Sequence, residues 1–560
     1  MQTRFANVTQ RTTDWQSVNW RKAHRVVKNL RQRIFKATRN ADWSRVRNLQ
    51  RLLLKSYSNV LLAVRRVTQI NAGKRTPGID KLLVKTGPAK AILVDALKQW
   101  IPWRPLAAKR VYIPKSNGKR RPLGIPSIID RCFQAMVKAA LEPCWEAQFE
   151  PTSYGFRPGR SAHDAIARIY VTARAANHKK WVLDADIAGC FDTIDHKFLL
   201  NQVGNFPARG LIAQWLKAGY LEDGVFHPTS AGAPQGGIIS PLLANIALHG
   251  MEAALGVSRY PQGYVKKDVR KLIVRYADDF VVFCDSKAEA EQAQADLQRF
   301  LRVRGLQLSE EKTRIVHLSE GFDFLGFNVR HYQSQNTRTG WKLLIKPAKK
   351  SVSTFREKLR QTFKRLHGSN AKCLIKVLNP IIRGWANYYR GVVSSEIFHK
   401  LECDIFWKLR RWISKTHPNK SFSWRDRRYW AHHPAYPGSQ WSFMDKDSGM
   451  VLYRIGYTRI QRHPLIKGDA SPDNPDLREY FEQRAKRSRL IEDYPKAAQR
   501  VIRRQQAKCP NCGQSLFNGE DIHVHHKVPR CQGGTNHSSN LVAVHLICHS
   551  QLHRRALEIA

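Results

Sequence analysis

The sequence predicts a multidomain α+β protein, and three observations indicate this fold class. The chain has 560 residues, which is enough for three or four domains that each bury a core. Amphipathic helical patterns over 15–70 give way to a mixed pattern of strands and helices up to about residue 330, and helical patterns return over 351–415. Cysteine and histidine residues then gather in a compact tail that begins at residue 508.

The chain carries a large positive charge. It has 95 Lys and Arg residues against 44 Asp and Glu residues, which gives a formal net charge of +51. This charge favours a polyanionic partner, and the 15 Trp, 17 Tyr and 23 Phe residues offer rings that stack on unpaired bases. We therefore expect a nucleic acid partner. An anionic membrane is the alternative, but no run of 18 apolar residues is present, so we expect no membrane partner.

The sequence lacks the marks of a secreted protein. Its first residues, MQTRFANVTQRTTDW, contain no apolar core of a signal peptide. The ten cysteines are scattered and do not form a disulfide framework, so we expect a reducing, cytoplasmic compartment. Six of them are expected to be ordinary core residues: Cys132, Cys144, Cys190, Cys284, Cys373 and Cys403.

Two regions are predicted to be helical from apolar residues at helical spacing. In both regions Arg and Lys fill the other helix faces. Over 416–495 the periodicity is weak, and Trp, His, Pro and Arg predict an irregular basic module or linker. The apolar residues of the two helical regions are Val46, Leu49, Leu53, Val60, Val64 and Val67, and then Phe355, Leu359, Phe363 and Leu366.

A basic hairpin is predicted over 109–127, around Asn117 and Gly118. Its cations could close on a triphosphate, although a basic hairpin is more often a solvated edge. Further on, SAGAPQGGIISPLLANI (230–246) predicts a glycine-rich loop that enters an apolar helix and permits close backbone approach by a nucleotide or template. The cations of the hairpin are Lys115, Lys119, Arg120 and Arg121.

Adjacent carboxylates occur in the run RKLIVRYADDFVVFCD. Apolar β-branched residues on both sides of Tyr276–Asp279 predict two strands that close a hairpin, with Asp278 and Asp279 at its tip. Two like charges about 4 Å apart cost roughly 4 kcal/mol at an effective dielectric constant of about 20. A divalent cation would neutralise this repulsion. A solvated hairpin tip is the alternative for an isolated pair.

A second predicted strand, Trp181–Ile187, supplies another carboxylate. Asp184 and Asp186 lie on one face of it, and Asp186 lies at its end. Nucleotidyl transfer by two metal ions needs carboxylates that hold cations about 4 Å apart. Asp186 suits this chemistry if its strand pairs with the hairpin. We expect Asp184 to be structural, and Asp192 and Asp195 to begin helices.

Seven blocks of sequence, in order, resemble the group II intron reverse transcriptases. They are RVYIPKSNGKRRPLGIP, SYGFRPGRSAHDAI, DADIAGCFDTIDH, GAPQGGIISPLLANI, RYADDFVVF, GLQLSEEKT and FDFLGF. In addition, GWANYYRGV (384–392) is similar to the thumb, or maturase X, domain of that family. The resemblance covers nearly the whole chain. It implies right-hand-like fingers and palm, followed by an α-helical thumb.

The resemblance also implies residue roles. Asp186, Asp278 and Asp279 would bind the catalytic Mg²⁺ ions, and Phe191 would exclude a ribose 2′-hydroxyl so that the product is DNA. Which of the contiguous cations at 119–121 points inward stays open. The residues implied to bind the dNTP are Lys115 and Arg121 at the triphosphate, the Ile187 backbone, Phe191, Gln235, and Lys312 at a distal phosphate.

The tail contains a candidate zinc site. Cys509 and Cys512 form a CxxC pair, and His545 and Cys548 repeat its spacing 33 residues later. A module of about 50 residues cannot build an adequate core alone, and Zn²⁺ binding can fold it. Chance clustering is the weaker alternative. Cys531 breaks the spacing and is expected to be a bystander.

Between these pairs, the tail resembles an HNH nuclease, a small ββα-metal zinc module. The resemblance implies that His526 is the general base, and that Asn540 orients the base or pins the loop. His525 and His549 would bind the catalytic metal, either Mg²⁺ or a transition metal, because many members carry an acidic residue where His525 stands. His553 is a further ligand or a surface residue. A purely structural zinc module is the alternative.

The expected domain order follows from these resemblances. It comprises a basic helical N-terminal extension (1–90), the reverse transcriptase fingers and palm (91–330), the thumb or maturase X domain (331–420), a DNA-binding region or linker (421–495), and the HNH endonuclease with zinc knuckles (496–560).

We accordingly expect a multifunctional intron-encoded protein of the bacterial cytoplasm, associated with the nucleoid or a ribonucleoprotein. It would copy RNA into DNA from dNTPs, promote splicing by binding its group II intron RNA, and nick target double-stranded DNA for target-primed reverse transcription. A catalytically silent RNA-binding splicing cofactor is the alternative, but such members lose the aspartates or the tail. A stand-alone reverse transcriptase of a retron or defence system is disfavoured by the X-like block and the tail.

Overall fold

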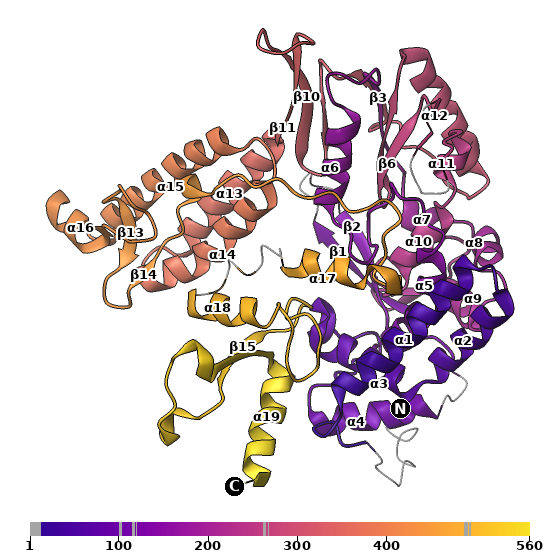
Figure 1. The fold of residues 1–560 in the computed structure, drawn as a ribbon, viewed down its shortest axis with the longest axis horizontal. Coiled ribbons are helices and arrows are strands. Elements are labelled where there is room, and N and C mark those ends of the chain that lie inside the picture. The colour runs from indigo at the N-terminus through magenta and orange to yellow at the C-terminus, as the bar shows by residue number, and fades with distance from the viewer. Residues whose placement is uncertain are drawn as a thin grey trace.

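A computed structural model describes residues 13–99, 103–114, 118, 120–260, 265–266, 268–486, 491, 494 and 496–559. It has the expected α+β architecture of several packed parts (Figure 1). The N-terminal helices and the palm lie on the right of the view, the thumb lies on the left, and the C-terminal module lies below.

The N-terminal part is a group of helices packed on a long central helix. Its helices α1 (Trp20–Arg39), α2 (Trp43–Lys55) and α3 (Tyr57–Arg65) each contact α5 (Ile128–Glu146), and α3 also contacts α4 (Gly87–Lys98). Asn19 and Asp42 cap α1 and α2 through their side chains. The prediction of amphipathic helices is confirmed, because Val46, Leu49, Leu53, Val60, Val64 and Val67 are all buried.

The fingers contain a small sheet of strand order β2-β1-β4-β5. Strands β1 (Ala108–Pro114) and β2 (Arg120–Ile125) pair antiparallel from Lys109–Ile125 to Pro114–Arg120, which confirms the basic hairpin. The short strands β4 (Tyr220–Glu222) and β5 (Val225–His227) complete the sheet. The predicted turn residue Asn117 lies outside the described residues, as do Lys115 and Lys119.

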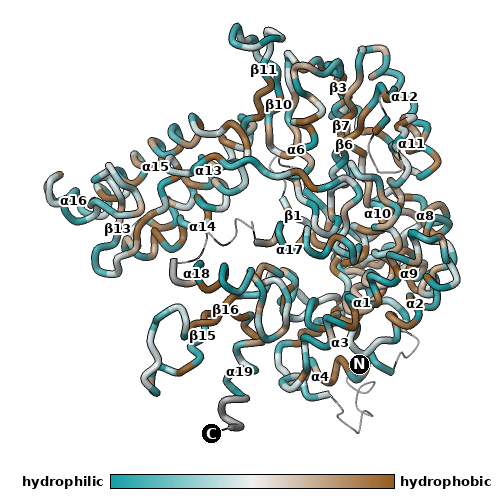
Figure 2. The backbone as a smooth tube through the Cα atoms, viewed as in Figure 1, coloured by the Kyte–Doolittle hydropathy of each residue, from teal (hydrophilic) through white to brown (hydrophobic). Residues whose placement is uncertain are grey.

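The palm is a four-stranded sheet of order β6-β7-β3-β8. Its strands are β6 (Leu272–Tyr276), β7 (Asp279–Cys284), β3 (Trp181–Asp186) and β8 (Arg314–His317), and Figure 2 shows apolar stretches along them. Helices α6 (Ala162–Thr172) and α12 (Lys287–Arg302) pack on these strands. The remaining palm helices are α7 (Cys190–Thr193), α8 (His196–Val203), α9 (Arg209–Lys217), α10 (Ser240–Ala247) and α11 (Met251–Ala254).

The thumb follows a second antiparallel sheet of order β11-β10-β9. Strands β9 (Phe322–Phe324), β10 (Phe327–Gln333) and β11 (Trp341–Pro347) lead into helices α13 (Lys349–Arg365), α14 (Ala371–Tyr389) and α15 (Ser395–Thr416). The predicted apolar face of the first helix is confirmed: Phe355, Leu359 and Phe363 are buried and Leu366 is partly buried.

Residues 416–486 are more regular than their weak periodicity predicts. Helix α16 (Phe422–Tyr429) and the short strands β12 (Trp430–Ala431), β13 (Ser442–Asp445) and β14 (Met450–Val451) pack at the far end of the thumb. These elements are too short to show a period in the sequence. An extended strap, residues 454–477, then leads from the thumb to α17 (Arg478–Lys486).

The strap is fixed at several points along its course. The Ile466 amide donates to Asp164 at the start of α6, and Arg160 donates to the carbonyl of Gly468. Arg31 of α1 pairs with Asp473 at 2.6 Å. The strap therefore connects the thumb, the palm and the N-terminal helices.

The C-terminal module packs against the N-terminal helices. It comprises α18 (Lys496–Arg504), the hairpin of β15 (Ile522–His526) with β16 (Leu541–His545), and α19 (Leu546–Ile559). Arg65 pairs with Glu520 at 2.7 Å, and their side chains are only 1% and 4% exposed. Gln551 donates to the carbonyl of Gln16, and Arg21 donates to the carbonyl of Pro510. The two ends of the chain thus form one interface.

Two expectations about individual residues are wrong. Cys373 and Cys403 are exposed, whereas the other four cysteines expected in the core are buried. Cys373 lies on α14 and Cys403 on α15, and in an amphipathic helix the position along the helix rather than the residue type decides burial. Within the described residues, no helix is long and apolar enough to cross a membrane.

Replacing Arg65 should loosen the C-terminal module. The Arg65→Ala substitution leaves the Glu520 carboxylate buried without its partner, which typically costs about 3–5 kcal/mol. Faster amide exchange and proteolysis of residues 508–550 in the variant would be measured by mass spectrometry. Arg21→Ala, which removes an exposed contact, is the control. An Arg65→Ala protein as protected as the wild type would contradict the prediction.

Acidification should weaken the same interface through His24. Burial, with Arg65 and then His545 as further causes, lowers the pKa of His24 from 6.5 to about 3. The unfolded chain therefore binds a proton that the folded chain does not, and stability is lost as the pH falls below 6.5. In thermal melts, His24→Gln should lose less stability on acidification than the wild type. Parallel losses in both proteins would show that His24 does not carry the effect.

Candidate functional site

The three candidate aspartates lie at one end of the palm sheet. Strands β3 and β7 pair antiparallel with Asp186 opposite Asp279, so the condition set by the sequence, that the two strands pair, is fulfilled. Asp278 lies in the turn between β6 and β7, directly after Ala277, whose φ of 59° is in the left-handed region. The fold thus brings carboxylates from two distant segments together.

Burial and mutual repulsion raise the pKa values of Asp278 and Asp279. Burial raises the pKa of Asp279 to about 7, and Asp278 and Asp186 add to the rise. Because the Asp279 side chain reaches solvent, we attribute much of this rise to the neighbouring carboxylates. Burial also raises the pKa of Asp278, and Asp186 adds to that rise while Arg121 and Lys312 oppose it.

Lys312 contacts this cluster directly. Its ammonium group forms an ion pair with Asp186, and the pKa of Lys312 is raised by this hydrogen bond. Among the described residues, the oxygens of the three carboxylates do not gather within 4.8 Å of one another. The ion pair with Asp186 places the ammonium group of Lys312 beside these carboxylates.

The glycine-rich loop lies beside Phe191 and the fingers. The Ala233 amide donates to the carbonyl of Phe191, whose side chain is 9% exposed, and the Gly124 amide of β2 donates to the carbonyl of Gln235. The side-chain oxygen of Gln235 is buried without a hydrogen-bond partner among the described residues. Ile187 is buried and bridges to Leu308.

Asp184, Asp192 and Asp195 take structural positions. Asp184 pairs with Arg314 at 2.9 Å, Asp195 caps α8 by accepting from the Phe198 amide, and Asp192 lies in the first turn of α7. These placements agree with what the sequence predicted for them.

Four metal-ligand atoms converge in the C-terminal module. Those of Cys509, Cys512, His545 and Cys548 lie within 4.8 Å of one another, and all four residues are fully buried. His545 Nδ1 faces the Cys512 sulfur at 3.3 Å while Nε2 contacts the Ser515 carbonyl at 3.0 Å, which fixes the ring. Hydrogen bonds from Cys512 and Cys548 hold the pKa of the Cys509 thiol far below its ordinary range. This donor set fits Zn²⁺.

A second convergent group consists of imidazoles. The ligand atoms of His525 on β15 and of His549 and His553 on α19 lie within 4.8 Å of one another. Burial, and then the neighbouring His553, lowers the pKa of His549 to about 4, and the pKa of His525 is lowered for the same reasons. The lowered pKa values of His525 and His549 favour their neutral form, which is the form that binds metal. Of the two alternatives for His553, the geometry favours the ligand.

His526 lies next to this group, on the opposite face of β15 because successive strand residues alternate. Its Nε2 contacts the Asn536 side-chain oxygen at 2.9 Å. Asn540 accepts from the Val528 amide and donates to the carbonyls of Val528 and Thr535. Asn540 thus pins the loop, whereas Asn536, which the sequence did not single out, contacts the expected base.

Family models match four segments of the chain. They are the N-terminal domain of reverse transcriptase (15–97), reverse transcriptase (RNA-dependent DNA polymerase) (113–329), the group II intron maturase-specific domain (352–430) and HNH endonuclease (509–555). Protein YkfC of Escherichia coli is 37% identical over 324 residues, which cover 51% of this chain and 84% of YkfC. The group II intron-encoded protein LtrA of Lactococcus lactis is 31% identical over 384 residues, which cover 54% of this chain and 63% of LtrA.

The chain belongs to the group II intron-encoded reverse transcriptases. It is a multifunctional intron-encoded protein with reverse transcriptase, maturase and HNH endonuclease domains, and the catalytically silent alternative is not favoured. A solved structure of apo telomerase from Candida tropicalis aligns with 40% of this chain and 53% of its own, at 15% identity and a TM-score of 0.30, which is too low to add to the assignment.

Sequence reasoning missed the residues that hold the reverse transcriptase turn. Arg275 is 2% exposed and donates to the Asn245 side chain at 2.9 Å and to the Ala277 carbonyl at 3.3 Å. Asn245 in turn donates to the Gly155 carbonyl. A Cβ on Gly155 would lie 2.3 Å from the Ala277 nitrogen, so only glycine fits against the turn. These contacts join segments about 30 to 120 residues apart, and no local pattern reveals them.

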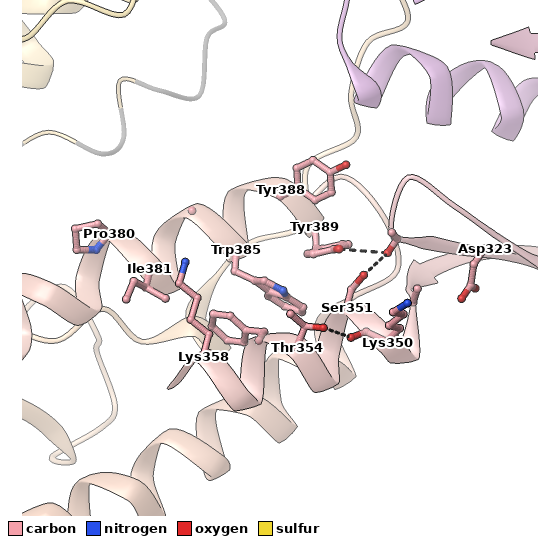
Figure 3. Close-up of a pocket in the computed structure, with 14 residues that line it drawn as sticks. Asp323, Lys350, Ser351, Thr354, Lys358, Pro380, Ile381, Trp385, Tyr388 and Tyr389 are labelled. Carbon is pink, nitrogen blue, oxygen red and sulfur yellow. Dashed lines mark hydrogen bonds between the residues drawn. The ribbon is translucent and has the colours of Figure 1, made fainter. Parts of the chain in front are cut away.

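A cavity of about 720 Å³ opens where the thumb meets the palm (Figure 3). The hydroxyls of Ser351 and Tyr389 both donate to the Gly326 carbonyl at 3.2 Å, which ties the β9–β10 turn to α13 and α14. Gly384 lies in the wall, and a Cβ there would meet nothing within 4 Å. Aromatic and basic residues of the lining include Lys350, Phe355, Lys358, Trp385 and Tyr388.

Removing the Asn245 amide should slow DNA synthesis without unfolding the palm. Asn245→Ala leaves Arg275 and the Gly155 carbonyl short of partners and lets the Asp278–Asp279 turn shift. We expect kcat for primer extension to fall on the order of 10- to 100-fold, because small displacements of reacting groups are that costly. Arg314→Ala, which releases only Asp184, is the matched control. Wild-type kcat in Asn245→Ala would contradict a positioning role.

Proposed function

We propose that this protein inserts its intron RNA into DNA in three coupled steps. The RNA joins one strand of a double-stranded DNA target, the HNH module nicks the other strand, and the palm extends the freed 3′-hydroxyl along the RNA. The observation that carries this proposal is that one chain holds the palm aspartates, with Asp186 opposite Asp279, and the histidine site, in a C-terminal module that docks on the N-terminal helices through Arg65 and Glu520. The protein would act in the bacterial cytoplasm as a ribonucleoprotein.

Each of the palm residues would have its own role in nucleotidyl transfer. Asp186, Asp278 and Asp279 offer the carboxylate oxygens that Mg²⁺ prefers, and bound Mg²⁺ would neutralise charge on the primer hydroxyl and the triphosphate. Arg121 lies close enough to lower the pKa of Asp278, which supports contact with the triphosphate. Phe191, beside the glycine-rich loop, would exclude the ribose 2′-hydroxyl. The role of Lys115 stays a prediction outside the described residues.

Gln235 and Lys312 would complete the nucleotide site. The buried, unpartnered oxygen of Gln235 suits a donor on the incoming dNTP. Lys312, now paired with Asp186, would shift toward a distal phosphate when the triphosphate brings its own charge. Ile187 would contribute its backbone beside Asp186.

In the nuclease module, His526 would remove a proton from the attacking water. An amide oxygen can only accept, so the contact with Asn536 assigns the His526 proton to Nε2 and leaves Nδ1 as the base. His525, His549 and His553 would hold the nuclease metal. An all-imidazole set favours a transition metal over Mg²⁺, and the bound metal would stabilise charge on the scissile phosphate. Zn²⁺ at Cys509, Cys512, His545 and Cys548 would be structural.

A basic groove between α13 and α15 supports binding of the intron RNA. This cavity of about 530 Å³ gathers cations of both helices, and their repulsion would be relieved by phosphates. Its residues are Arg360, Phe363, Lys364, His367, Lys408, Arg411, Trp412 and Lys415.

The separate cavity at Gly384 would receive the primer–template duplex. A glycine inside a helix destabilises it by about 1 kcal/mol relative to alanine. No neighbouring atom lies within 4 Å of a Cβ at Gly384, so packing inside the protein does not require glycine there, and close approach of a ligand would.

Two substitutions should separate the activities. Asp278→Asn removes a carboxylate of the palm and should abolish primer extension on an RNA template while leaving DNA nicking intact. His526→Ala should abolish second-strand nicking while leaving primer extension and intron splicing intact. Each protein serves as the control for the other. Primer extension by Asp278→Asn at the wild-type rate would instead favour the silent splicing cofactor, and loss of splicing in His526→Ala would assign the tail to RNA folding.

A further inference from the structure

An aromatic cavity lies at the far end of the thumb, between α15 and the small sheet of β12 and β13. Its volume is about 330 Å³, which is within the range of ligand sites. Polar groups are few and include the ion pair of Arg454 with Glu402 at 2.7 Å. The aromatic residues that line it are Phe406, Trp407, Trp430, Trp441, Phe443 and Tyr453.

Two of the rings at this cavity, those of Trp407 and Trp441, are exposed. Trp407 is 62% exposed and Trp441 is 40% exposed, although aromatic side chains normally bury most of their surface. Trp407 meets Phe406 at 79° and 5.5 Å between ring centroids, so this edge contact leaves much of the indole surface uncovered. Phe422, nearby on α16, is 64% exposed and lies over the Arg410 guanidinium. Exposed aromatic rings gathered around one cavity form a candidate binding surface.

One polar group at the cavity has no partner. The indole nitrogen of Trp430 is buried and makes no hydrogen bond among the described residues, while the residue is 7% exposed. A buried donor without an acceptor costs about 1–3 kcal/mol. A planar ligand that carries a carbonyl oxygen would relieve this cost after a small adjustment of the rings. Nucleobases combine such oxygens with flat faces that stack on indoles.

The charges around the cavity favour a nucleic acid over an apolar peptide. Trp407 is followed on α15 by Lys408 and, one turn on, by Arg411, and both cations line the basic groove between α13 and α15. The aromatic cavity and the basic groove therefore flank a single helix. A strand whose phosphates lie in the groove would therefore pass along the same helix that carries Trp407.

We propose that this cavity binds an unpaired base of the intron RNA, stacked on Trp407 and Trp441. The site rests on the proposed RNA-binding function and adds to it a second kind of contact. Phosphate contacts in the groove provide affinity for any RNA, whereas the cavity selects loops or bulges whose bases are free. The protein thus recognises an RNA that has exposed a nucleotide at the right distance from a phosphate track.

The test uses the full-length protein and a single-stranded RNA oligonucleotide that carries one 2-aminopurine. Trp407→Ala should weaken binding about 5- to 100-fold, because stacking contributes roughly 1–3 kcal/mol per base. The quenching of 2-aminopurine fluorescence on binding should be lost as well. Trp407→Phe, which keeps a stacking ring, should recover most of both signals. Trp43→Ala, an exposed tryptophan of α2 outside the cavity, is the matched control.

The salt dependence of binding distinguishes stacking from charge. Trp407→Ala should lower affinity without changing the slope of log K against log salt, whereas Lys408→Ala should reduce that slope by about 0.7. Equal affinity of Trp407→Ala and wild type, or equal losses with a fully paired RNA, would overturn the base site alone. A loss seen with single-stranded DNA and not with RNA would overturn the RNA assignment. A wild type that binds no RNA would overturn the RNA-binding function on which the site rests.

Discussion

The antiparallel register of β3 with β7 is the constraint on which the polymerase depends. Side chains alternate along a strand, so a shift of one residue would turn Asp186 away from Asp279 and move every core residue of the strand to the other face. The palm holds this register from both sides. The Ser309 amide donates to the Asp186 carbonyl, and Arg275 holds the turn that follows β6.

Repulsion between the carboxylates makes this rigidity necessary. The raised pKa of Asp279 shows that the folded chain holds negative charge where it is unfavourable. A soft turn would relieve the repulsion by moving apart, and the site would lose its ability to bind cations. Arg275, Asn245 and Gly155 prevent this movement from beneath the turn. Contacts beneath the turn thus stabilise an arrangement of carboxylates that their own repulsion disfavours.

Local chemistry decides how far the sequence predicts the site. The Tyr276–Asp279 hairpin, the cap of α8 and the two pairs of zinc ligands each depend on residues close in sequence, and the sequence predicts them. Arg275, Asn536 and the strap depend on partners that only the tertiary fold brings near. The exposure of Cys373 and Cys403 depends on which helix face meets the core, which composition does not reveal. The roles of Lys115 and Lys312 stay predictions, because they concern a bound nucleotide.

The strap also limits the movement of the C-terminal module. A free linker between thumb and nuclease would let the C-terminal module explore a large volume, and its effective concentration at the palm would depend on chain length. Contacts of Ile466, Gly468 and Asp473 instead hold the strap against the palm and the N-terminal helices before the chain reaches α17. These contacts therefore restrain how far the thumb and the C-terminal module can separate from the palm and the N-terminal helices.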